Sequence, residues 1–411
     1  MKLTLEQGLK LKKEYGTPLY VYDVDYMKNV MSLYTNNFKS NYFKTEVAFA
    51  SKAFCVKEMV RLIDSCGLSL DCVSLGELYT AKCASFDLSK VYFHGNNKTI
   101  DELMFALNNC VGTIVVDNLM ELEVLEELCN SYNKSCNILI RLNVGVEAHT
   151  HKFIVTAHVD SKFGVLYGSD DYLKMIDLVN KSSHINFLGF HSHIGSQIFD
   201  LKAFDAAIYK LVSYALDFDK KLVINLGGGF GVWYTDEDKP IPFDEVAKNL
   251  ITTCEECTKK LGVELEKLVI EPGRSIVACA GLTLYTIGYK KQTPNKLYYF
   301  IDGGMTDNIR PALYQAKYSA DVLGKEEVIK NKVVTVAGKC CESGDIILEN
   351  IPLQDATTGD LLVTYTTGAY GYSMSSNYNK ALTPAVVFVE NGVSKCVVKR
   401  QTLDELIMRE E

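Results

Sequence analysis

Four short stretches of the sequence carry residue types that could do chemistry, and each ends a strand-like apolar run. The residues are Lys52 just after VAFA, His191 and His193 in INFLGFHSH, the glycines 227–229 in LVINLGG, and Glu271 in KLVIEP. A lysine can form a Schiff base, and glycines let backbone N–H groups approach a phosphate. A histidine can ligate a metal or stack on a flat ring, and a carboxylate can hold a protonated ring nitrogen. The chemistry therefore depends on whether the fold brings these stretches together.

The apolar runs alternate with stretches of helical periodicity, such as KEMVRLIDS and NLMELEVLEEL. A doubly wound sheet also alternates strands and helices, but eight units in roughly 230 residues match a (β/α)₈ barrel. The carboxyl ends of barrel strands meet at one face, so we expect the reactive residues to gather there. The expected strands lie within residues 47–50, 68–74, 91–94, 113–117, 138–143, 185–193, 222–228 and 267–272.

The pattern changes near residue 280, where short runs rich in β-branched and aromatic residues replace the alternation, as in KLYYFID and LLVTY. A similar run, TPLYVYD at 17–23, precedes the first barrel unit. We expect it to pair with the C-terminal strands. The sequence thus predicts a barrel over residues 28–275 and a discontinuous, mostly β domain (a β-barrel or sandwich) from residues 1–27 and 276–411.

The composition narrows the class of protein. A chain of 411 residues exceeds one usual hydrophobic core, and 47% apolar with 23% charged residues is typical of a globular protein. The formal charge of −8 argues against nucleic-acid binding, and no apolar run could span a membrane. Thirteen cysteines without regular spacing, together with an N-terminus unlike a signal peptide, favour a cytoplasmic protein with reduced thiols.

Each candidate residue also has an ordinary structural interpretation. Lys52 could be a solvated lysine, the glycines a tight turn, and Glu271 the ion-pair partner of Arg274. If Lys52 instead forms a Schiff base, partial burial would lower the pKa of its amine. Taken together, lysine, glycine turn, histidine and strand-end carboxylate describe a pocket for pyridoxal 5′-phosphate (PLP) more completely than any other cofactor site.

The histidines raise a metal alternative. His191 and His193 form an H-x-H pair of the kind that ligates zinc, and His149 and His151 form another. No carboxylate stands at a familiar ligand spacing, so no metal is expected. A barrel metallohydrolase remains a distant alternative.

The stretch AGKCCESGDI, residues 337–346, combines two adjacent cysteines with Glu342 and Asp345. Residues of these types in a glycine-bounded loop could form part of a metal site, a redox switch or a catalytic acid, or could be only a loop. The stretch alone does not decide among these.

A series of motifs links the sequence to a known family. In chain order they are FASKAF, DCVSLGE, HGNNK, SKFG, HSHIGSQ, GGGFG, EPGR, MTDNIRPALY, CCESGD and TGAYGYSMSSNYN. The chain resembles the fold type III PLP-dependent decarboxylases over nearly its whole length. HSHIGSQ, RPALY, CESGD and GAYGYSMSSNYN look specifically like the diaminopimelate decarboxylase family.

The resemblance implies a role for each matching residue. Lys52 would form the Schiff base with PLP, His193 would stack on the ring, and Glu271 would keep the ring nitrogen protonated. The cofactor's phosphate would be held by Ser196, Gly227, Gly228, Gly229, Gly273 and Tyr370, and in some relatives by the arginine matching Arg274. Substrate would be bound by Arg274, Arg310, Tyr314, Glu342 and Tyr370.

The resemblance also implies a homodimer with shared active sites, in which Cys341 and Glu342 of one subunit reach the site of its neighbour. Cys341 would be the acid near the substrate Cα, and Glu342 would bind the distal ammonium. With the metal alternative disfavoured, Cys340 is expected to be a packed neighbour.

The activity that the resemblance implies is decarboxylation of meso-diaminopimelate to L-lysine, the last step of lysine biosynthesis. Another amino acid (ornithine, lysine, arginine or carboxynorspermidine) is the alternative substrate. The sequence departs from the family's common residues at Phe49, Phe54, Val144 and Lys339, and none of these positions carries a catalytic group.

Overall fold

The computed structural model describes residues 2–146 and 160–411, so the His149–His151 pair lies outside the described residues. The chain forms two compact units. One contains Met1–Asn29, Val232–Lys239 and Arg274–Glu411, and the other contains Val30–Gly231 and Pro240–Gly273. The segment Val232–Lys239 thus belongs with the β-rich unit, although it lies in the middle of the barrel sequence.

The second unit is a parallel barrel. Within the described ranges, eight strands pair in parallel with their neighbours, and β10 pairs with β2 to close the ring. The expected (β/α)₈ barrel is confirmed. Its strands are β2 (Lys44–Ala50), β3 (Ser69–Cys72), β4 (Val91–Phe93), β5 (Thr113–Val116), β6 (Cys136–Asn143), β8 (Ile185–His191), β9 (Leu222–Asn225) and β10 (Leu265–Ile270), with the two-residue β7 (Val165–Leu166) beside β6.

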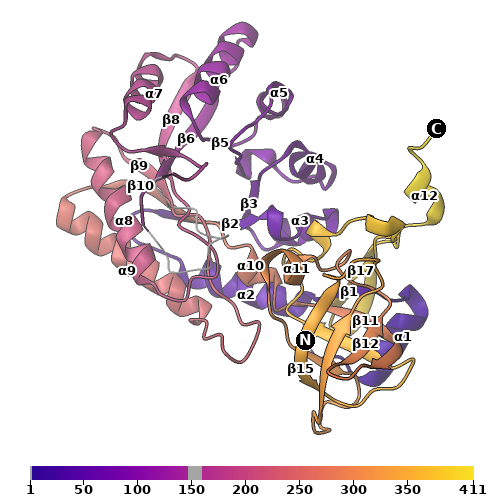
Figure 1. The fold of residues 1–411 in the computed structure, drawn as a ribbon. Helices are drawn as coiled ribbons and strands as arrows, with labels where there is room; N and C mark the ends of the chain where they lie inside the picture. The colour runs from indigo at the N-terminus through magenta and orange to yellow at the C-terminus, as the bar shows by residue number, and fades with distance from the viewer. Residues whose placement is uncertain (1, 147–159) are drawn as a thin grey trace. The chain divides into compact units, whose positions relative to one another are not determined.

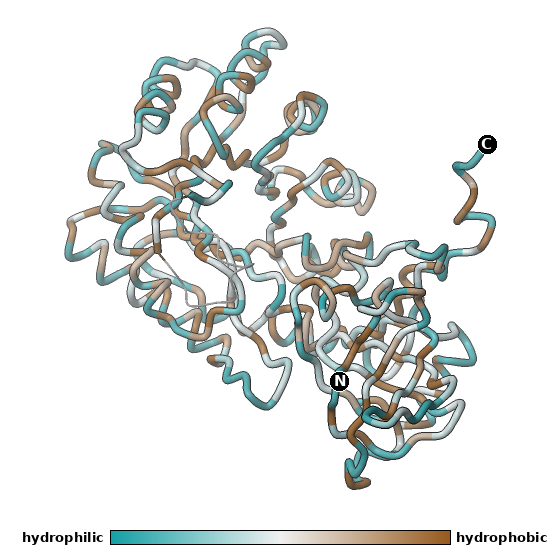
Figure 2. The backbone as a smooth tube through the Cα atoms, viewed as in Figure 1, coloured by the Kyte–Doolittle hydropathy of each residue, from teal (hydrophilic) through white to brown (hydrophobic). Residues whose placement is uncertain are grey.

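Helices surround the barrel strands (Figure 1). Their starts follow local sequence signals: Ser74, Thr99, Asn118 and Ser169 each cap a helix by accepting a backbone N–H bond. Hydrophobic and hydrophilic residues alternate along these helices, as in amphipathic helices with one face on a core (Figure 2). The helices are α3 (Lys57–Ser65), α4 (Leu75–Cys83), α5 (Ile100–Asn108), α6 (Leu119–Tyr132), α7 (Asp170–Lys181), α8 (Lys202–Tyr214) and α9 (Phe243–Leu261).

One glycine lets two barrel strands approach closely. Gly189 in β8 has φ +150°, and a Cβ atom there would lie 2.1 Å from the carbonyl oxygen of Val223 in β9. Any side chain would push β8 away from β9. This contact keeps His191, at the end of β8, beside Asn225, at the end of β9.

The first unit is built on a mixed sheet that includes the N-terminal strand, as expected. Strand β1 (Leu19–Asp23) lies between β11 (Gly281–Gln292), its antiparallel neighbour, and β17 (Ala385–Glu390), its parallel neighbour. The remaining strands are β12 (Leu297–Ile301), β13 (Ala320–Val322), β14 (Lys332–Ala337), β15 (Ile346–Leu353), β16 (Leu361–Tyr365) and β18 (Val393–Val398). Three of its helices are α1 (Leu5–Tyr15), α11 (Arg310–Tyr314) and α12 (Leu403–Ile407).

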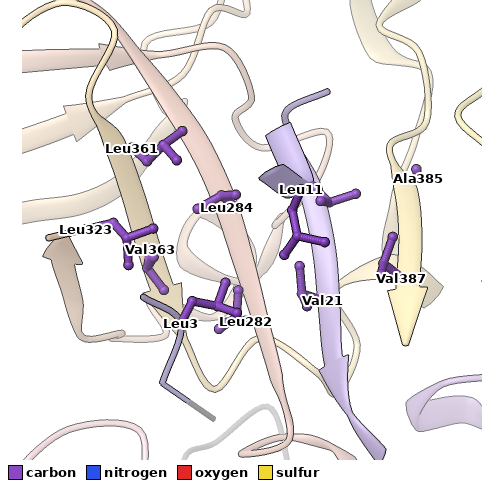
Figure 3. Packing of buried hydrophobic residues seen from close by; sticks show 11 residues of the cluster. Leu3, Leu11, Val21, Leu282, Leu284, Leu323, Leu361, Val363, Ala385 and Val387 are labelled. Atoms are coloured by element: carbon purple, nitrogen blue, oxygen red, sulfur yellow. The ribbon is translucent and has the colours of Figure 1, made fainter. Parts of the chain in front are cut away.

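A hydrophobic cluster joins the two ends of the chain within this unit (Figure 3). Leu11 and Val21 come from the N-terminal segment, whereas Leu284, Val363 and Val387 come from three C-terminal strands. All five are buried. The N-terminal strand is therefore part of the core and not an appendage. Among the described residues, no helix is long and apolar enough to cross a membrane.

Replacement of Leu284 by alanine tests this cluster. Leu284 is 0% exposed, so Leu284→Ala leaves a cavity and should reduce the free energy of unfolding by about 2–5 kcal/mol. Leu403→Ala is the matched control, because Leu403 in α12 is 70% exposed and should change stability little. Urea unfolding followed by circular dichroism measures both. Equal midpoints for the two variants would contradict the central place of Leu284.

Candidate active site

Glu271 lies at the centre of a buried polar group inside the barrel. It follows β10, and three donors from other strand ends surround its carboxylate. His94 Nε2 lies 2.8 Å and Asn225 Nδ2 2.7 Å from Oε1, and His191 Nε2 lies 3.2 Å from Oε2. The strands β4, β8 and β9 thus each contribute one donor. The structural alternative for Glu271, an ion pair with Arg274, is not needed to explain how its carboxylate is stabilised.

These neighbours determine the charge of the group. Burial disfavours the ionised form of Glu271, but interactions with His94 and His191 outweigh it and hold its pKa well below the usual value. Burial lowers the pKa of His191 to about 3, so this ring is neutral at physiological pH. Burial also raises the pKa of Asp71, whose Oδ1 lies 3.7 Å from His94 Nε2. Glu271 is therefore a buried anion stabilised by its electrostatic interactions and hydrogen bonds with the two histidines.

The glycine turn after β9 packs against the same strand ends. Gly227 has φ +67° and Gly229 has φ +110°, conformations that favour glycine. A Cβ at Gly228 would lie 2.2 Å from the carbonyl oxygen of Glu271. The N–H of Gly228 donates to His193 Nδ1 at 3.2 Å. The turn thus contacts both His193, the histidine predicted to stack on the cofactor ring, and Glu271, at the end of β10.

His193 and Ser196 lie in the loop after β8, and both are half-buried. Burial, together with the nearby cations Lys52 and Arg141, lowers the pKa of His193 well below its usual value, so its ring is neutral. A neutral imidazole is suited to packing against a flat ring.

Lys52 lies in the short turn Ser51–Ala53 that follows β2. Its electrostatic influence on His193 and Asp71 places it on the same side of the barrel as those groups. The expected partial burial is not found, because Lys52 is exposed. The strand end carries the lysine beyond the packed layer, where its amine is accessible to a carbonyl compound. Gly273, next to the strand end of β10, is buried against Ala50.

The donor set of the barrel fits PLP. A buried anion at Glu271 suits a protonated pyridine nitrogen, and an accessible lysine suits an aldehyde. His191 Nδ1 and Asp71 Oδ1 are buried without a hydrogen-bond partner, which marks a polar region not completed by the protein alone. The residues present therefore match the cofactor expected from the sequence.

The structure brings together three possible metal ligands, and they are not the H-x-H pair that the sequence indicated. His94, His191 and Glu271 each offer one ligand atom, and these atoms lie within 4.8 Å of one another. The H-x-H pair of the metal alternative does not act together here, because His193 instead contacts the glycine turn through Gly228. The carboxylate of this set is Glu271, which follows β10. The spacing of residues along the sequence did not indicate it as a metal ligand.

The β-rich unit contains a cluster of arginines and tyrosines. Arg274 and Arg310 both donate to the hydroxyl of Tyr234, at 2.6 and 3.0 Å, and Arg310 also donates to the hydroxyl of Tyr318 at 2.6 Å. The ring of Tyr370 lies 4.7 Å from the Arg274 guanidinium carbon. All but the half-buried Tyr370 are buried. Two cations that share one hydroxyl make a site suited to an anionic group.

The stretch 337–346 forms the turn between β14 and β15. Asp345 is buried and organises it, because its carboxylate accepts N–H bonds from Met305 at 2.6 Å and Cys340 at 2.8 Å. Cys341 and Glu342 are exposed at the tip of this turn. Cys340 is half-buried, and burial followed by the charge of Asp345 raises the pKa of its thiol to about 11. The two cysteines are therefore not equivalent.

Two predicted residues lie apart from these clusters. Tyr314, at the end of α11, is half-buried, and among the described residues no hydrogen bond or ring contact joins it to the Tyr234 cluster. Glu342 accepts a long hydrogen bond of 3.4 Å from the Tyr378 hydroxyl. The structure thus brings Arg274, Arg310 and Tyr370 together, but not Tyr314 or Glu342.

Sequence reasoning missed four residues of these clusters: His94, Asn225, Tyr234 and Tyr318. A signal existed for the first two. His94 follows β4 and Asn225 ends β9, so the rule that barrel strand ends carry the chemistry applies to both. Tyr234 and Tyr318 gave no comparable signal, because neither follows a barrel strand.

Comparison with known proteins identifies the family of the chain. The pyridoxal-binding domain of the pyridoxal-dependent decarboxylases matches residues 28–278. Diaminopimelate decarboxylase of Bacillus subtilis (strain 168) is 47% identical over 97% of this chain and 92% of its own length. That of Staphylococcus aureus (strain COL) is 42% identical over 100% of this chain and 97% of its own.

Solved structures agree over nearly the whole chain. The crystal structure of diaminopimelate decarboxylase from M. jannaschii in complex with L-lysine is 31% identical, with a TM-score of 0.91 over 98% of this chain and 94% of that one. The family model, the sequence identities and the structural match agree. The chain therefore belongs to the diaminopimelate decarboxylase family of the pyridoxal-dependent decarboxylases.

Proposed function

We propose that the protein decarboxylates meso-diaminopimelate to L-lysine and CO₂ with PLP as cofactor, the last step of lysine biosynthesis. The observation that supports this substrate is the pair of buried arginines, Arg274 and Arg310, that converge on the Tyr234 hydroxyl. Diaminopimelate carries a second carboxylate at its distal end, and ornithine and lysine carry none. A paired cationic site suits the dicarboxylate better than those alternatives.

The proposed roles of the barrel residues follow from their positions. PLP, when bound, supplies the electron sink for the carbanion left by loss of CO₂. Lys52 would hold the cofactor through its amine. Glu271 holds a proton at the ring nitrogen, and His193 packs on the ring. The phosphate is held by Ser196, Gly227, Gly228, Gly229, Gly273 and Tyr370. In some relatives the arginine matching Arg274 serves the phosphate, but here we assign Arg274 to the substrate carboxylate.

The proposed roles of the β-rich unit concern the substrate. Arg274, Arg310, Tyr314 and Tyr370 bind carboxylate, and Glu342 binds the distal ammonium. Cys341 delivers a proton to Cα. The exposure of Cys341 and Glu342 on a turn fixed by Asp345 suits two residues that serve the neighbouring subunit of a homodimer.

Two further parts of the proposal concern the chain as a whole. We place the barrel domain at 28–275 and the β domain at 1–27 with 276–411. We also place the protein in the cytoplasm. All thirteen cysteines are unpaired in the structure, in keeping with a reducing compartment.

A barrel metallohydrolase is the second candidate, and one observation favours it. The ligand atoms of His94, His191 and Glu271 lie close enough together for one divalent ion. Such an enzyme would bind zinc and be colourless, whereas a PLP enzyme has a visible absorption band.

The first test is spectroscopic. The protein purified with PLP should show a visible band that borohydride reduction fixes covalently on Lys52, and Lys52→Ala should abolish both. Added meso-diaminopimelate should yield CO₂ and lysine. Zinc without a band would overturn the PLP assignment, whereas a band with turnover of another amino acid would overturn only the substrate.

The two cysteines provide a matched pair of variants. Cys341→Ala should lower kcat by about 100-fold, because it removes the proposed proton donor. Cys340→Ala should change kcat little, because the thiol is half-buried against Asp345 with a raised pKa. Steady-state rates of CO₂ release measure both, and equal losses would contradict the assignment.

Removal of one hydroxyl tests the arginine pair. Tyr234→Phe deletes the shared acceptor of Arg274 and Arg310, and a hydrogen bond to a charged group contributes about 1.5–3 kcal/mol. KM for diaminopimelate should rise by about tenfold or more, with a smaller change in kcat. Tyr289→Phe is the control, since Tyr289 is 77% exposed. A fall in kcat at unchanged KM would argue against a substrate-binding role.

A further inference from the structure

Donors of the protein fill most, but not all, of the hydrogen-bond acceptor positions of the Glu271 carboxylate. An ionised carboxylate has about four acceptor positions, two on each oxygen. Oε1 accepts from two donors, His94 Nε2 and Asn225 Nδ2, at 2.8 and 2.7 Å. In the part of the chain that the structure describes, Oε2 accepts only from His191 Nε2, at the longer distance of 3.2 Å. One acceptor position, on Oε2, is therefore left for a further donor.

His94 is itself held in place by its surroundings. Its backbone N–H donates to the carbonyl oxygen of Cys72 at 2.7 Å, which fixes the residue at the end of β4. Its ring packs edge-on against the ring of His191 with 4.7 Å between centroids. Because an ionised carboxylate only accepts, the Nε2 of His94 must carry a hydrogen. His94 is thus a fixed donor to Glu271 and not a freely rotating side chain.

Asn225 connects Glu271 with the glycine turn. Its Nδ2 donates to Glu271 Oε1, and its Oδ1 accepts the N–H of Gly227 at 2.9 Å. One amide therefore ties the proposed ring-nitrogen partner to the proposed phosphate turn. An aspartate of the same shape could keep the bond to Gly227 but could not donate to Glu271.

We propose that His94 and Asn225 are positioning residues for the decarboxylase. By occupying Oε1 they hold the Glu271 carboxylate so that Oε2 is the atom that accepts the proton-bearing ring nitrogen of bound PLP. The inference rests on the proposed role of Glu271 but not on the identity of the substrate. Its test therefore reads the cofactor first and turnover second.

Other titratable groups lie around this carboxylate and enter any pH profile. They are Lys52 after β2, Asp71 in β3, Arg141 in β6, and His191 and His193 at and after the end of β8. None of these groups is altered in the variants below. A difference between variants in the midpoint of the band therefore reports on the donors to Oε1.

Asn225→Asp is the sharpest variant. It places a second negative charge beside Oε1, which raises the pKa of Glu271, so that the carboxylate draws the proton away from the ring nitrogen. A less protonated ring withdraws fewer electrons, so the pH midpoint of the visible band should move up by about one unit. At the same time kcat should fall by about 10- to 100-fold with little change in KM. Asn186→Asp is the matched control, because Asn186 lies at the start of β8, at the opposite end of the strand from His191.

The second pair replaces His94. His94→Gln keeps an N–H donor near the position of Nε2, whereas His94→Leu removes it. The midpoint of the band and kcat should be near those of the parent enzyme in His94→Gln and displaced in His94→Leu. These variants decide the matter if Asn225→Asp does not fold.

The holoenzymes are titrated from low to high pH in the absence of substrate, and kcat and KM are then measured. Equal spectra and rates in parent, Asn225→Asp and His94→Leu would overturn the positioning roles, as would equal displacement in His94→Gln and His94→Leu. A parent protein that has the band but ignores diaminopimelate would overturn the proposed substrate and leave this test intact.

Discussion

A negative charge buried inside the barrel is the constraint on which the site depends. An unpaired buried carboxylate costs several kcal/mol, so Glu271 can remain ionised only where donors surround it. Two of those donors come from β9, the direct neighbour of β10, and from β8 next to it, whereas His94 comes from β4, three strands away on the other side of β10, and is brought to Glu271 when the barrel closes. The fold and the charge are therefore linked: closure of the sheet creates the electrostatic site, and Gly189 permits the close approach that keeps two of the donors adjacent.

The β-rich unit solves a different problem, that of holding two cations together. Arg274 and Arg310 repel each other, and the shared hydroxyl of Tyr234 and the nearby aromatic rings stabilise them. Burial raises the free energy of the two positive charges, which favours binding of an anion there.

Much of the fold could be predicted because its strands are continuous apolar runs. All eight barrel strands and β1 were recognisable in this way, and Lys52, His193 and Glu271 followed from their places at strand ends. Strand β15 was not, because IILENIPL contains a proline, and Asn350 has φ +51° in an irregular pairing with β14. The His94–Glu271 contact was also missed, because it joins residues 177 positions apart and exists only after closure.

The double-cysteine stretch shows why residue types alone left its role open. Its most chemically suggestive members, two thiols and two carboxylates, are separated by burial into different tasks. Asp345 is buried and accepts the N–H groups of Met305 and Cys340, so it acts as the anchor of the turn. Because the anchor also restrains Cys340, Cys341 and Glu342 are the thiol and the carboxylate that this turn leaves exposed to solvent. They are also the two residues for which we propose a role in the site of a neighbouring subunit, so burial separates the residue that holds the turn from the residues that the turn presents.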